Sequence, residues 1–368
     1  MKKLKVVLTG GPCGGKTTAI QTIEEEFLEK GYQVLIVPEA ATILISSGIK
    51  PFGDNKISMV EFQKYVMDLQ EFLEEVAERA AERSDKDVII VCDRGLMDDK
   101  AYVSEKEFVE LLNERGTFQF ELMNRYDLVL HLKSAACGKE EFYTLDNNAA
   151  RTESPAEARE KDKKTLNAWL GHDSLKVIGN DVDFKTKINN CVKEIYNVLE
   201  KAYPVQCQEK YLIEKFDVSE LEKLQPVVFD IEQYAVFDET IEILYRKTMT
   251  EYETKYTAII KIDTDVNNER IVKRKNISEA EYYRCIPKNF LPIKKKRYCF
   301  EYMNQYFRLD VFGDDLKILE IEDTVQTKER SVPSFIEVID NVTDNTFYRN
   351  SALYLNKNIV PCEIVKKN

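Results

Sequence analysis

Three features are missing from this sequence of 368 residues: long apolar runs, paired cysteines and a surplus of positive charge. No apolar run approaches the ~20 residues that a membrane-spanning helix needs. The eight cysteines form no CxxC pair and have no histidine at metal-ligand spacing, so we expect neither a disulfide framework nor a zinc site. The net charge of −12 argues against a stable nucleic-acid partner, because polyanion binding needs a basic surface.

The composition that is present is typical of a folded globular protein. Hydrophobic residues make up 43% of the chain and charged residues 32%. A chain of this length is too long for one core, so we expect two domains. Met1–Lys5 runs directly into a predicted strand, so we expect no signal peptide and a cytoplasmic location. The segment Arg270–Arg297 is rich in Lys and Arg, a pattern that alone is more typical of a solvated face.

Residues 1–203 alternate apolar strands with helices. The expected strands are of the kind buried on both faces of a parallel sheet, and they are Lys5–Thr9, Gln33–Val37, Val88–Cys92 and Leu128–Leu132. Apolar residues at helical spacing predict the helices Lys16–Lys30, Met59–Ala81 and Phe184–Ala202. In the second of these helices the spaced apolar residues are Val60, Tyr65, Leu69, Leu73, Val76 and Ala80. The alternation predicts an α/β domain with a parallel sheet.

After Pro204 the pattern changes to short alternating runs. It predicts a mostly antiparallel β domain over 227–368, joined to the first domain by a linker over 204–226. The expected strands are Val227–Tyr234, Thr240–Lys247, Lys255–Ile262, Arg270–Lys275, Lys296–Tyr302, Tyr306–Phe312 and Lys317–Glu322. Period-two alternation sends their charged residues to one side of each strand. Two interpretations are open: a sheet with its polar face toward water, or a closed barrel with a charged interior.

The clearest motif is Gly10–Thr17, which fits G-x-x-x-x-G-K-[ST] between a predicted strand and a predicted helix. Glycines let backbone N–H groups crowd around phosphates, and the helix N-terminus adds positive partial charge. We expect Lys16 to reach the β- and γ-phosphates and Thr17 to bind magnesium. The predicted nucleotide-binding residues are Gly10, Gly11, Pro12, Cys13, Gly14, Gly15, Lys16, Thr17 and Thr18.

Acidic residues follow two other predicted strands. Asp93 ends the buried strand Val88–Cys92, where it is suited to bind magnesium, through water, or to act as a general base; the alternative is a carboxylate that caps a turn. Arg94 comes next and would contact a substrate or phosphate. Glu39 could bind a substrate hydroxyl or act as the base, or it could be a helix-start carboxylate.

A polar segment over 147–164 carries Arg151 and Arg159, which we expect to be lid arginines over the transferred phosphate. A solvated helix is the alternative for such a charge run. Trp169 is the only tryptophan, and a lone tryptophan is best interpreted as a residue packed in the core. Asn180, at the end of a short strand, is a candidate for a contact with the base or the lid.

Taken together, these motifs resemble those of known families. The phosphate loop, Val37–Ala41, Cys92–Gly95, Ala150–Glu153 with Asp162, Trp169–His172 and Asn180 resemble P-loop ATPase/kinase-like domains related to nicotinamide-riboside kinases and deoxynucleoside kinases. The second half is similar to CYTH-like, triphosphate-tunnel domains in Phe229–Glu232, Lys294–Phe300, Asn304–Asp310 and Leu319–Glu320. The combination resembles the TRPL translocation defect protein family, and the resemblance covers nearly the whole chain.

The resemblance implies a closed barrel that binds a phosphorylated ligand. The cationic residues expected to bind the anion are Arg246, Lys261, Lys273, Lys275, Lys295, Arg297 and Arg308, and the acidic residues expected to hold metal are Glu232, Asp310, Glu320 and Glu322. One departure matters: the tunnel enzymes' first strand carries E-x-E-x-K, whereas Asp230–Tyr234 has no lysine. A literal match at Glu251–Lys255 falls on an expected hairpin tip and is a coincidence.

Our prediction is magnesium-dependent binding and slow hydrolysis of ATP or GTP, coupled to binding of a phosphoinositide head group or polyphosphate by the barrel. GTP and phosphoinositide binding, and with the latter a peripheral membrane contact, are implied by the family resemblance. The N/TKxD guanine motif is missing, so the residues do not choose the base. Two alternatives stay open: a kinase for a small, nucleoside-like substrate, and a metal-dependent triphosphatase in the barrel.

Overall fold

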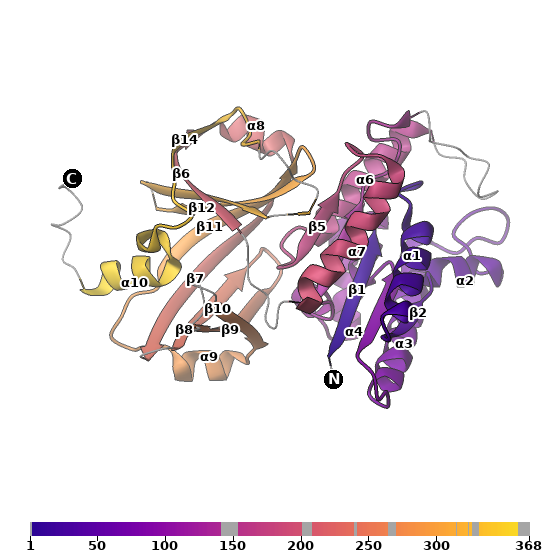
Figure 1. Cartoon of the computed structure of the whole chain (residues 1–368), viewed down its shortest axis with the longest axis horizontal. Helices are drawn as coiled ribbons and strands as arrows, with labels where there is room; N and C mark the ends of the chain where they lie inside the picture. The colour runs from indigo at the N-terminus through magenta and orange to yellow at the C-terminus, as the bar shows by residue number, and fades with distance from the viewer. Residues whose placement is uncertain are drawn as a thin grey trace. The chain divides into compact units, whose positions relative to one another are not determined.

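The computed structural model describes residues 2–140, 154–200, 208–238, 241–263, 270–313, 315–322, 324–325 and 331–359. The chain divides into two compact units (Figure 1). One unit comprises Met1–Leu199 with Thr324–Lys328, and the other comprises Glu200–Asp323 with Glu329–Asn368. Each has its own sheet and its own core.

The first unit is built on a five-stranded sheet in the order β2-β3-β1-β4-β5, with every pairing parallel. Its strands are β1 Lys3–Thr9, β2 Gln33–Val37, β3 Val88–Asp93, β4 Leu128–Leu132 and β5 Leu175–Ile178. Its helices are α1 Lys16–Glu29, α2 Ala40–Ser46, α3 Met59–Ala81, η1 Leu96–Tyr102, α4 Glu105–Arg115, α5 Gln119–Met123, α6 Pro155–Trp169 and α7 Phe184–Glu200. The prediction of a parallel α/β sheet is confirmed.

The core of this unit lies between the sheet and helices α1 and α7. Leu4, Val6 and Leu8 of β1 pack there against apolar side chains of both helices, including Ile23 and Ile195. Because successive strand residues point to opposite faces, Lys5 and Val7 face the other side of β1. There Lys5 forms a buried ion pair of 2.6 Å with Glu74 of α3. The sheet is therefore covered on both faces, as parallel sheets require.

Helix α3 buries a different stripe from the apolar one that the sequence suggests. Its buried residues are Phe62, Gln63, Val66, Met67, Gln70, Glu74 and Ala81. Tyr65 and Val76, by contrast, are exposed. The physical reason is the ionic partner: Glu74 contacts Lys5 and Arg125, so a carboxylate occupies a position that periodicity alone would give to an apolar residue.

The second unit is built on a nine-stranded antiparallel sheet in the order β10-β9-β8-β7-β11-β12-β13-β6-β14. Its strands are β6 Gln208–Phe216, β7 Val227–Asp238, β8 Ile241–Met249, β9 Thr254–Asp263, β10 Arg270–Asn276, β11 Ile293–Tyr302, β12 Gln305–Phe312, β13 Leu316–Glu322 and β14 Ile336–Asn341. The short helices are α8 Val218–Lys223, α9 Glu279–Cys285, η3 Thr346–Tyr348 and α10 Asn350–Ile359.

The expected closure into a barrel is not found in the described part of the chain, where β10 and β14 are the two edges of the sheet. Edge strand β14 pairs with β6 through two register shifts, at Glu337/Val338 and Val338/Asp340. Bulges of this kind twist an edge strand away from further pairing.

The expected linker over 204–226 contributes to the second sheet instead of merely joining two domains. Strand β6 lies within it and pairs with both β13 and β14. Ile213 of β6 belongs to the apolar core of this unit, together with Phe300, Phe307 and Leu319. The segment is held by partners that lie about 100 residues further along the chain, so its own sequence does not reveal them.

Candidate functional site

The phosphate loop connects β1 to α1 and packs against the end of β4. Gly10 and Gly15 have φ angles of +135° and +93°, which favour glycine. A Cβ atom at Gly10 would clash with the carbonyl oxygen of Leu132, and one at Gly14 would lie 2.7 Å from the same oxygen. The loop therefore needs glycine at both places to sit this close to β4. Thr17 and Thr18 are located on the first turn of α1, where both are exposed.

Lys16 lies in a charged group formed by residues that follow neighbouring strands. Burial and the positive charge of Arg94 lower the pKa of Lys16, while Asp93, Glu39 and Asp98 act in the opposite direction. Strands β1, β2 and β3 are neighbours and parallel, so the residues after them meet at one edge of the sheet. The structure thus brings together Lys16, Glu39, Asp93 and Arg94, all of which the sequence singled out.

Asp93 presents a carboxylate oxygen that the protein leaves unsatisfied. Its Oδ1 atom is buried and has no hydrogen-bond partner among the described residues. Burial raises the pKa of Asp93, although Lys16 opposes this shift. A buried oxygen without a protein partner is usually bound by water, an ion or a ligand. The donor set formed by Asp93 and the hydroxyl of Thr17 fits a magnesium ion held beside nucleotide phosphates.

Glu39 is engaged by its neighbours. Its Oε1 accepts a hydrogen bond of 2.6 Å from Nε of Arg94, and its Oε2 accepts one of 2.6 Å from the Thr42 hydroxyl. Burial favours the neutral acid, but the charges of Arg94 and Lys16 outweigh it and lower the pKa of Glu39 to about 2. Arg94 has a left-handed backbone with φ +72°, and its Nη1 lies 3.5 Å from Oδ1 of Asp98.

A turn after β4, residues 134–137, supports one side of the phosphate loop. The Ser134 hydroxyl donates to the carbonyl oxygen of Pro12, and the Ala135 N–H donates to that of Cys13 at 3.3 Å. Asn180 holds the turn in place, because its Nδ2 donates to the carbonyl oxygens of Ser134 at 2.7 Å and Cys137 at 3.0 Å. Both amide protons of Asn180 are thereby used within the protein.

Lys187 of α7 was missed by the sequence analysis. Its Nζ donates to Oδ1 of Asn180 at 2.7 Å and to the carbonyl oxygen of Lys133 at 2.6 Å. Burial lowers the pKa of Lys187 to about 8. The sequence shows only a lysine on the apolar side of a predicted helix. Its partners, Lys133 and Asn180, come from two other segments of the chain, so the sequence alone does not identify them.

Helix α6 lies against this assembly through two charged side chains. Arg159 donates from Nη1 to the carbonyl oxygen of Ala136 at 3.1 Å and also pairs with Glu140. Asp162 accepts hydrogen bonds of 2.9 Å from the N–H groups of Gly11 and Ser134. Arg151, the other expected lid arginine, lies outside the described residues.

Trp169 at the end of α6 is fully buried. A Cβ at Gly95 would lie 3.0 Å from the Trp169 ring, and the ring makes an edge contact with Tyr126. Its place supports the packing interpretation.

In the second unit, strand register decides which predicted residues share a face. Residues paired directly across neighbouring strands have their side chains on the same side. Arg297 pairs with Asp310, Arg308 with Glu320, and Lys295 with Ile231. Following the register across β7, β8 and β9 places Arg246 and Lys261 on the same side. We call this side the charged face, and it includes Lys210, Glu242, Arg246, Lys255, Lys261, Arg274, Lys295, Arg297, Arg308, Asp310, Glu320 and Glu322.

Three predicted residues lie on the opposite side of the sheet. Glu232 pairs across the strands with Lys294, to which it forms an ion pair of 2.8 Å, and Lys294 is largely exposed. Lys273 and Lys275 pair with Ile260 and Ala258, which are on that side too. The β7 residues on the charged face include Phe229, Ile231 and Gln233 in place of Glu232.

The acidic residues of the charged face are occupied by its cations. Asp310 accepts hydrogen bonds of 2.6 and 2.7 Å from Arg297 and one of 2.6 Å from Lys295. Glu320 lies 3.1 Å from Lys210 and 3.5 Å from Arg297. Burial lowers the pKa of Lys295 to about 7, with the field of Arg297 adding to the effect, even though Asp310 opposes the shift.

The charged face does not fit the metal site that the resemblance implies. Within the part of the chain that the structure describes, no group of three or more His, Cys, Asp or Glu side chains is placed to hold a metal ion. Glu232 is on the wrong side, and Asp310 is bound by two cations.

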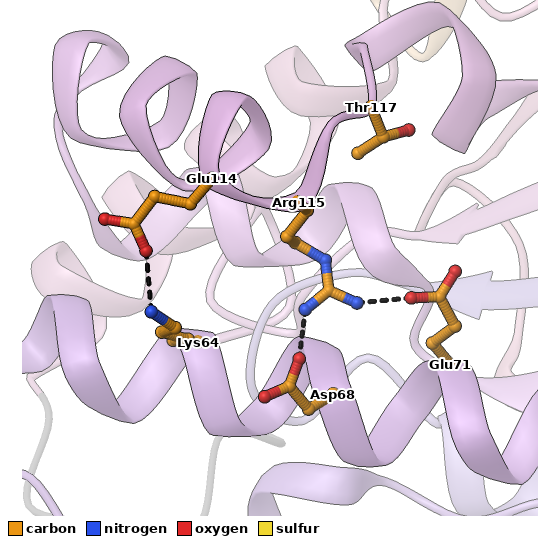
Figure 2. Close-up of a pocket in the computed structure, with 6 residues that line it drawn as sticks. All are labelled: Lys64, Asp68, Glu71, Glu114, Arg115 and Thr117. Atoms are coloured by element: carbon orange, nitrogen blue, oxygen red, sulfur yellow. Dashed lines mark hydrogen bonds and ion pairs between the residues drawn. The ribbon is translucent and has the colours of Figure 1, made fainter.

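A surface pocket of about 620 Å³ lies elsewhere in the first unit, between α3 and the end of α4 (Figure 2). In Figure 2, Arg115 reaches from α4 toward Asp68 and Glu71 of α3 and pairs with both. Lys64 and Glu114 form a second pair at 2.6 Å. The pocket's charges are therefore satisfied within the protein, and none of its residues was a predicted site residue.

A family model and solved structures are similar to parts of this chain. No curated protein matches the sequence. Among solved structures, the inorganic triphosphatase NE1496 is similar at 20% identity and a TM-score of 0.30, covering 42% of this chain and 97% of that one. A structure titled as the hypothetical protein NE1496 is similar at 19% identity and the same TM-score, covering 41% of this chain and 97% of that one. None of the helices described here is long and apolar enough to cross a membrane. Residues 5–187, which include the phosphate loop and Asp93, match the model of a family described as an AAA domain.

Proposed function

We propose that the first unit binds a nucleoside triphosphate with magnesium at Gly10–Thr18 and cleaves or transfers its terminal phosphate. The observation that carries the proposal is the buried, unpartnered Oδ1 of Asp93 beside Lys16 and a glycine loop. The match of residues 5–187 to an AAA domain supports nucleotide binding. The sequence motif and the orphan oxygen are independent, because the motif pattern does not include Asp93.

The cations have a simple electrostatic role in this proposal. Lys16 and Arg94 are close enough for Arg94 to lower the pKa of Lys16. A triphosphate placed between them replaces this repulsion with two attractions, so both residues favour the anion and its developing charge. Arg159 of α6 and Arg151 would add charge from the lid side.

Asp93 is a better candidate than Glu39 for the base. A base must accept a proton near neutral pH, and a carboxylate with a pKa of about 2 accepts one poorly. Asp93 has its pKa shifted upward by burial and keeps one oxygen unpartnered among the described residues. We therefore assign Asp93 to magnesium or to the attacking hydroxyl, and Glu39 to fixing the guanidinium of Arg94.

Either water or the hydroxyl group of a small substrate could accept the terminal phosphate at such a site. Hydrolysis of ATP or GTP is the main proposal, and a kinase for a nucleoside-like molecule is the alternative. A panel of nucleosides added to the Mg–ATP or Mg–GTP reaction separates them. Under the kinase alternative one nucleoside becomes phosphorylated, whereas under the main proposal only inorganic phosphate appears at the same rate with and without nucleosides.

The binding step is tested by thermal unfolding of the full chain with ATP, GTP, tripolyphosphate or inositol phosphates, each with magnesium. A ligand present at about 100 times its Kd should stabilise the folded protein by roughly 2.7 kcal/mol. The Lys16→Ala variant should lose the response to nucleotides. A wild-type protein that is stabilised by neither nucleotide would refute the proposal.

A second function is favoured by the charged face: binding of a phosphorylated anion such as a phosphoinositide head group or polyphosphate. Eight cationic side chains of the described strands share that face, and two of them, Arg246 and Lys261, come from β8 and β9, which do not adjoin the strand of Asp310. Arg246 donates to Gln233, and Lys261 lies 3.8 Å from Glu242. Guanidinium and ammonium groups recognise phosphate without a metal. In the same panel, an Arg246→Gln and Lys261→Gln double variant should lose the response to inositol phosphates or tripolyphosphate and keep the response to nucleotides.

A further inference from the structure

The second residue of the phosphate loop is glycine for a reason that the motif does not contain. In G-x-x-x-x-G-K-[ST] this position is unrestricted. A Cβ atom at Gly11 would lie 2.8 Å from Cβ and 2.9 Å from Oδ1 of Asp162, closer than real Cβ atoms approach other atoms. Helix α6 therefore packs its Asp162 side chain directly on the backbone of the phosphate loop.

The contact is also a pair of charge-assisted hydrogen bonds. Oδ1 of Asp162 accepts from the N–H groups of Gly11 and Ser134, both at 2.9 Å. The side chain is 1% exposed. Nε2 of His131 lies 3.4 Å from Oδ1, and Nζ of Lys133 lies 3.9 Å from Oδ2. Burial disfavours the charged form, but His131, Lys133 and the Gly11 amide outweigh it and hold the pKa of Asp162 below its usual range.

Asp162 thus joins three segments that are distant in sequence. It bonds the phosphate loop through Gly11 and the 134–137 turn through Ser134. The turn itself bonds the loop at Pro12 and Cys13. One helical turn before Asp162, Arg159 of α6 bonds the same turn at Ala136. A movement of α6 would therefore pull on the loop through one buried carboxylate.

We propose that Asp162 is a positioning residue that holds the phosphate loop in its binding conformation before nucleotide arrives and ties that conformation to helix α6. The proposal rests on the proposed nucleotide binding. Glycine-rich loops have many backbone conformations, and only those with converging N–H groups bind phosphate. If the competent fraction falls, the observed Kd rises by the inverse of that fraction. Asp162 keeps the competent fraction high without touching the ligand.

The test compares Asp162→Asn with a matched control on the same helix. The substitution keeps the size of the side chain but removes the charge that strengthens both hydrogen bonds. Glu160, two residues earlier, is largely exposed and pairs only weakly with Lys164 at 3.6 Å, so Glu160→Gln changes charge by the same amount without touching the loop. We measure the Kd for Mg–ATP or Mg–GTP, whichever stabilises the wild type, together with the unfolding temperature of the nucleotide-free protein.

D162N should raise the Kd by roughly tenfold, the scale of one charge-assisted hydrogen bond, and E160Q should leave it within about twofold. Gly11→Ala should weaken binding as well, because its methyl group displaces the carboxylate. Since G11A already breaks the contact, adding D162N to it should change the Kd little further. A purely structural role predicts instead a lower unfolding temperature with an unchanged Kd.

Two outcomes overturn the proposal while leaving nucleotide binding intact: an unchanged Kd in folded D162N, or additive effects of G11A and D162N. Absence of nucleotide binding by the wild type refutes the proposed function itself. Amide hydrogen exchange of the nucleotide-free wild type keeps the test decisive if D162N does not fold. The Gly11 and Ser134 amides should then be protected, and rapid exchange of both would contradict the proposal.

Discussion

Arg94 donates a hydrogen bond of 2.6 Å from Nε to Oε1 of Glu39. The bond links the segment after β3, which contains Arg94, to the segment after the neighbouring strand β2, which contains Glu39. Arg94 has a φ of +72°, an unfavourable backbone conformation for a residue with a side chain. It is held there by two hydrogen bonds: its N–H donates to the Leu8 carbonyl oxygen at 3.0 Å, and its own carbonyl oxygen accepts from Gln70 at 3.2 Å. Such conformations persist where the surrounding structure fixes them, often at functional sites.

Because Glu39 is paired with Arg94, substitutions of the two carboxylates beside Lys16, Asp93 and Glu39, should affect nucleotide turnover differently. Asp93→Asn should reduce nucleotide turnover by about 100-fold or more, because it removes the proposed metal ligand or base. Glu39→Gln should reduce turnover less, since an amide oxygen can still accept the hydrogen bond from Arg94. Phosphate release at saturating nucleotide measures both. A larger loss in E39Q than in D93N would reverse our assignment of the two roles.

Lys187 predicts a pH dependence of stability. Its pKa in the folded protein is about 8, below the ordinary value of 10.5. Between these values the unfolded chain binds more protons than the folded one, so the free energy of unfolding should rise with pH, by at most about 1.4 kcal/mol per pH unit. Lys187→Met removes this contribution. Its destabilisation, measured by urea unfolding at pH 7.5, 9 and 10, should therefore grow as pH rises, and a difference that shrinks would contradict the buried lysine.

Asp310 predicts a large loss of stability in the second unit. Asp310→Asn leaves Lys295 and Arg297 buried without their shared counter-charge, which should cost about 3 kcal/mol or more. Lys296→Gln is the control, because Lys296 pairs at 3.9 Å with Asp230 on the opposite, exposed side of the same strands. That change should cost under about 1 kcal/mol. Equal losses in urea unfolding would contradict the register-based assignment of the two faces.

Metal removal should separate the two proposed ligand sites. Nucleotide binding by the first unit should weaken in EDTA, since Thr17 and Asp93 fit a magnesium ion shared with the phosphates. Binding of inositol phosphates by the charged face should persist, because its acidic residues are already held by cations. Calorimetric titrations with magnesium or EDTA measure both. Loss of anion binding in EDTA would restore the metal-dependent triphosphatase alternative.

Much of the first unit is readable from sequence because its signals are local. The strand, loop and helix around Gly10–Thr17 follow one another along the chain, and Asp93 directly follows a buried apolar run. Chain order in a parallel sheet then brings Glu39, Asp93 and Arg94 to the edge occupied by Lys16. Asp162 and Lys187 act through backbone groups of distant segments, so residue type alone did not reveal their roles.

The second unit shows where period-two alternation is insufficient. Alternation predicts which residues of one strand share a side, but both sides of β11 carry cations, and alternation does not say which side of β7 meets which side of β11. Register places Glu232 with the exposed Lys294, whereas Asp310 lies with Arg297 on the charged face. Strand β6 was not predicted for a similar reason, because its partners β13 and β14 come much later in the chain.

Calorimetric titration of the wild type and Lys16→Ala with Mg–ATP and Mg–GTP is the sharpest test of nucleotide binding at the phosphate loop. We expect saturable one-to-one binding of at least one nucleotide to the wild type and its loss in K16A, with the variant folded and its response to inositol phosphates unchanged. Equal binding by both proteins, or none by the wild type, would contradict the assignment of Gly10–Thr18 as the nucleotide site.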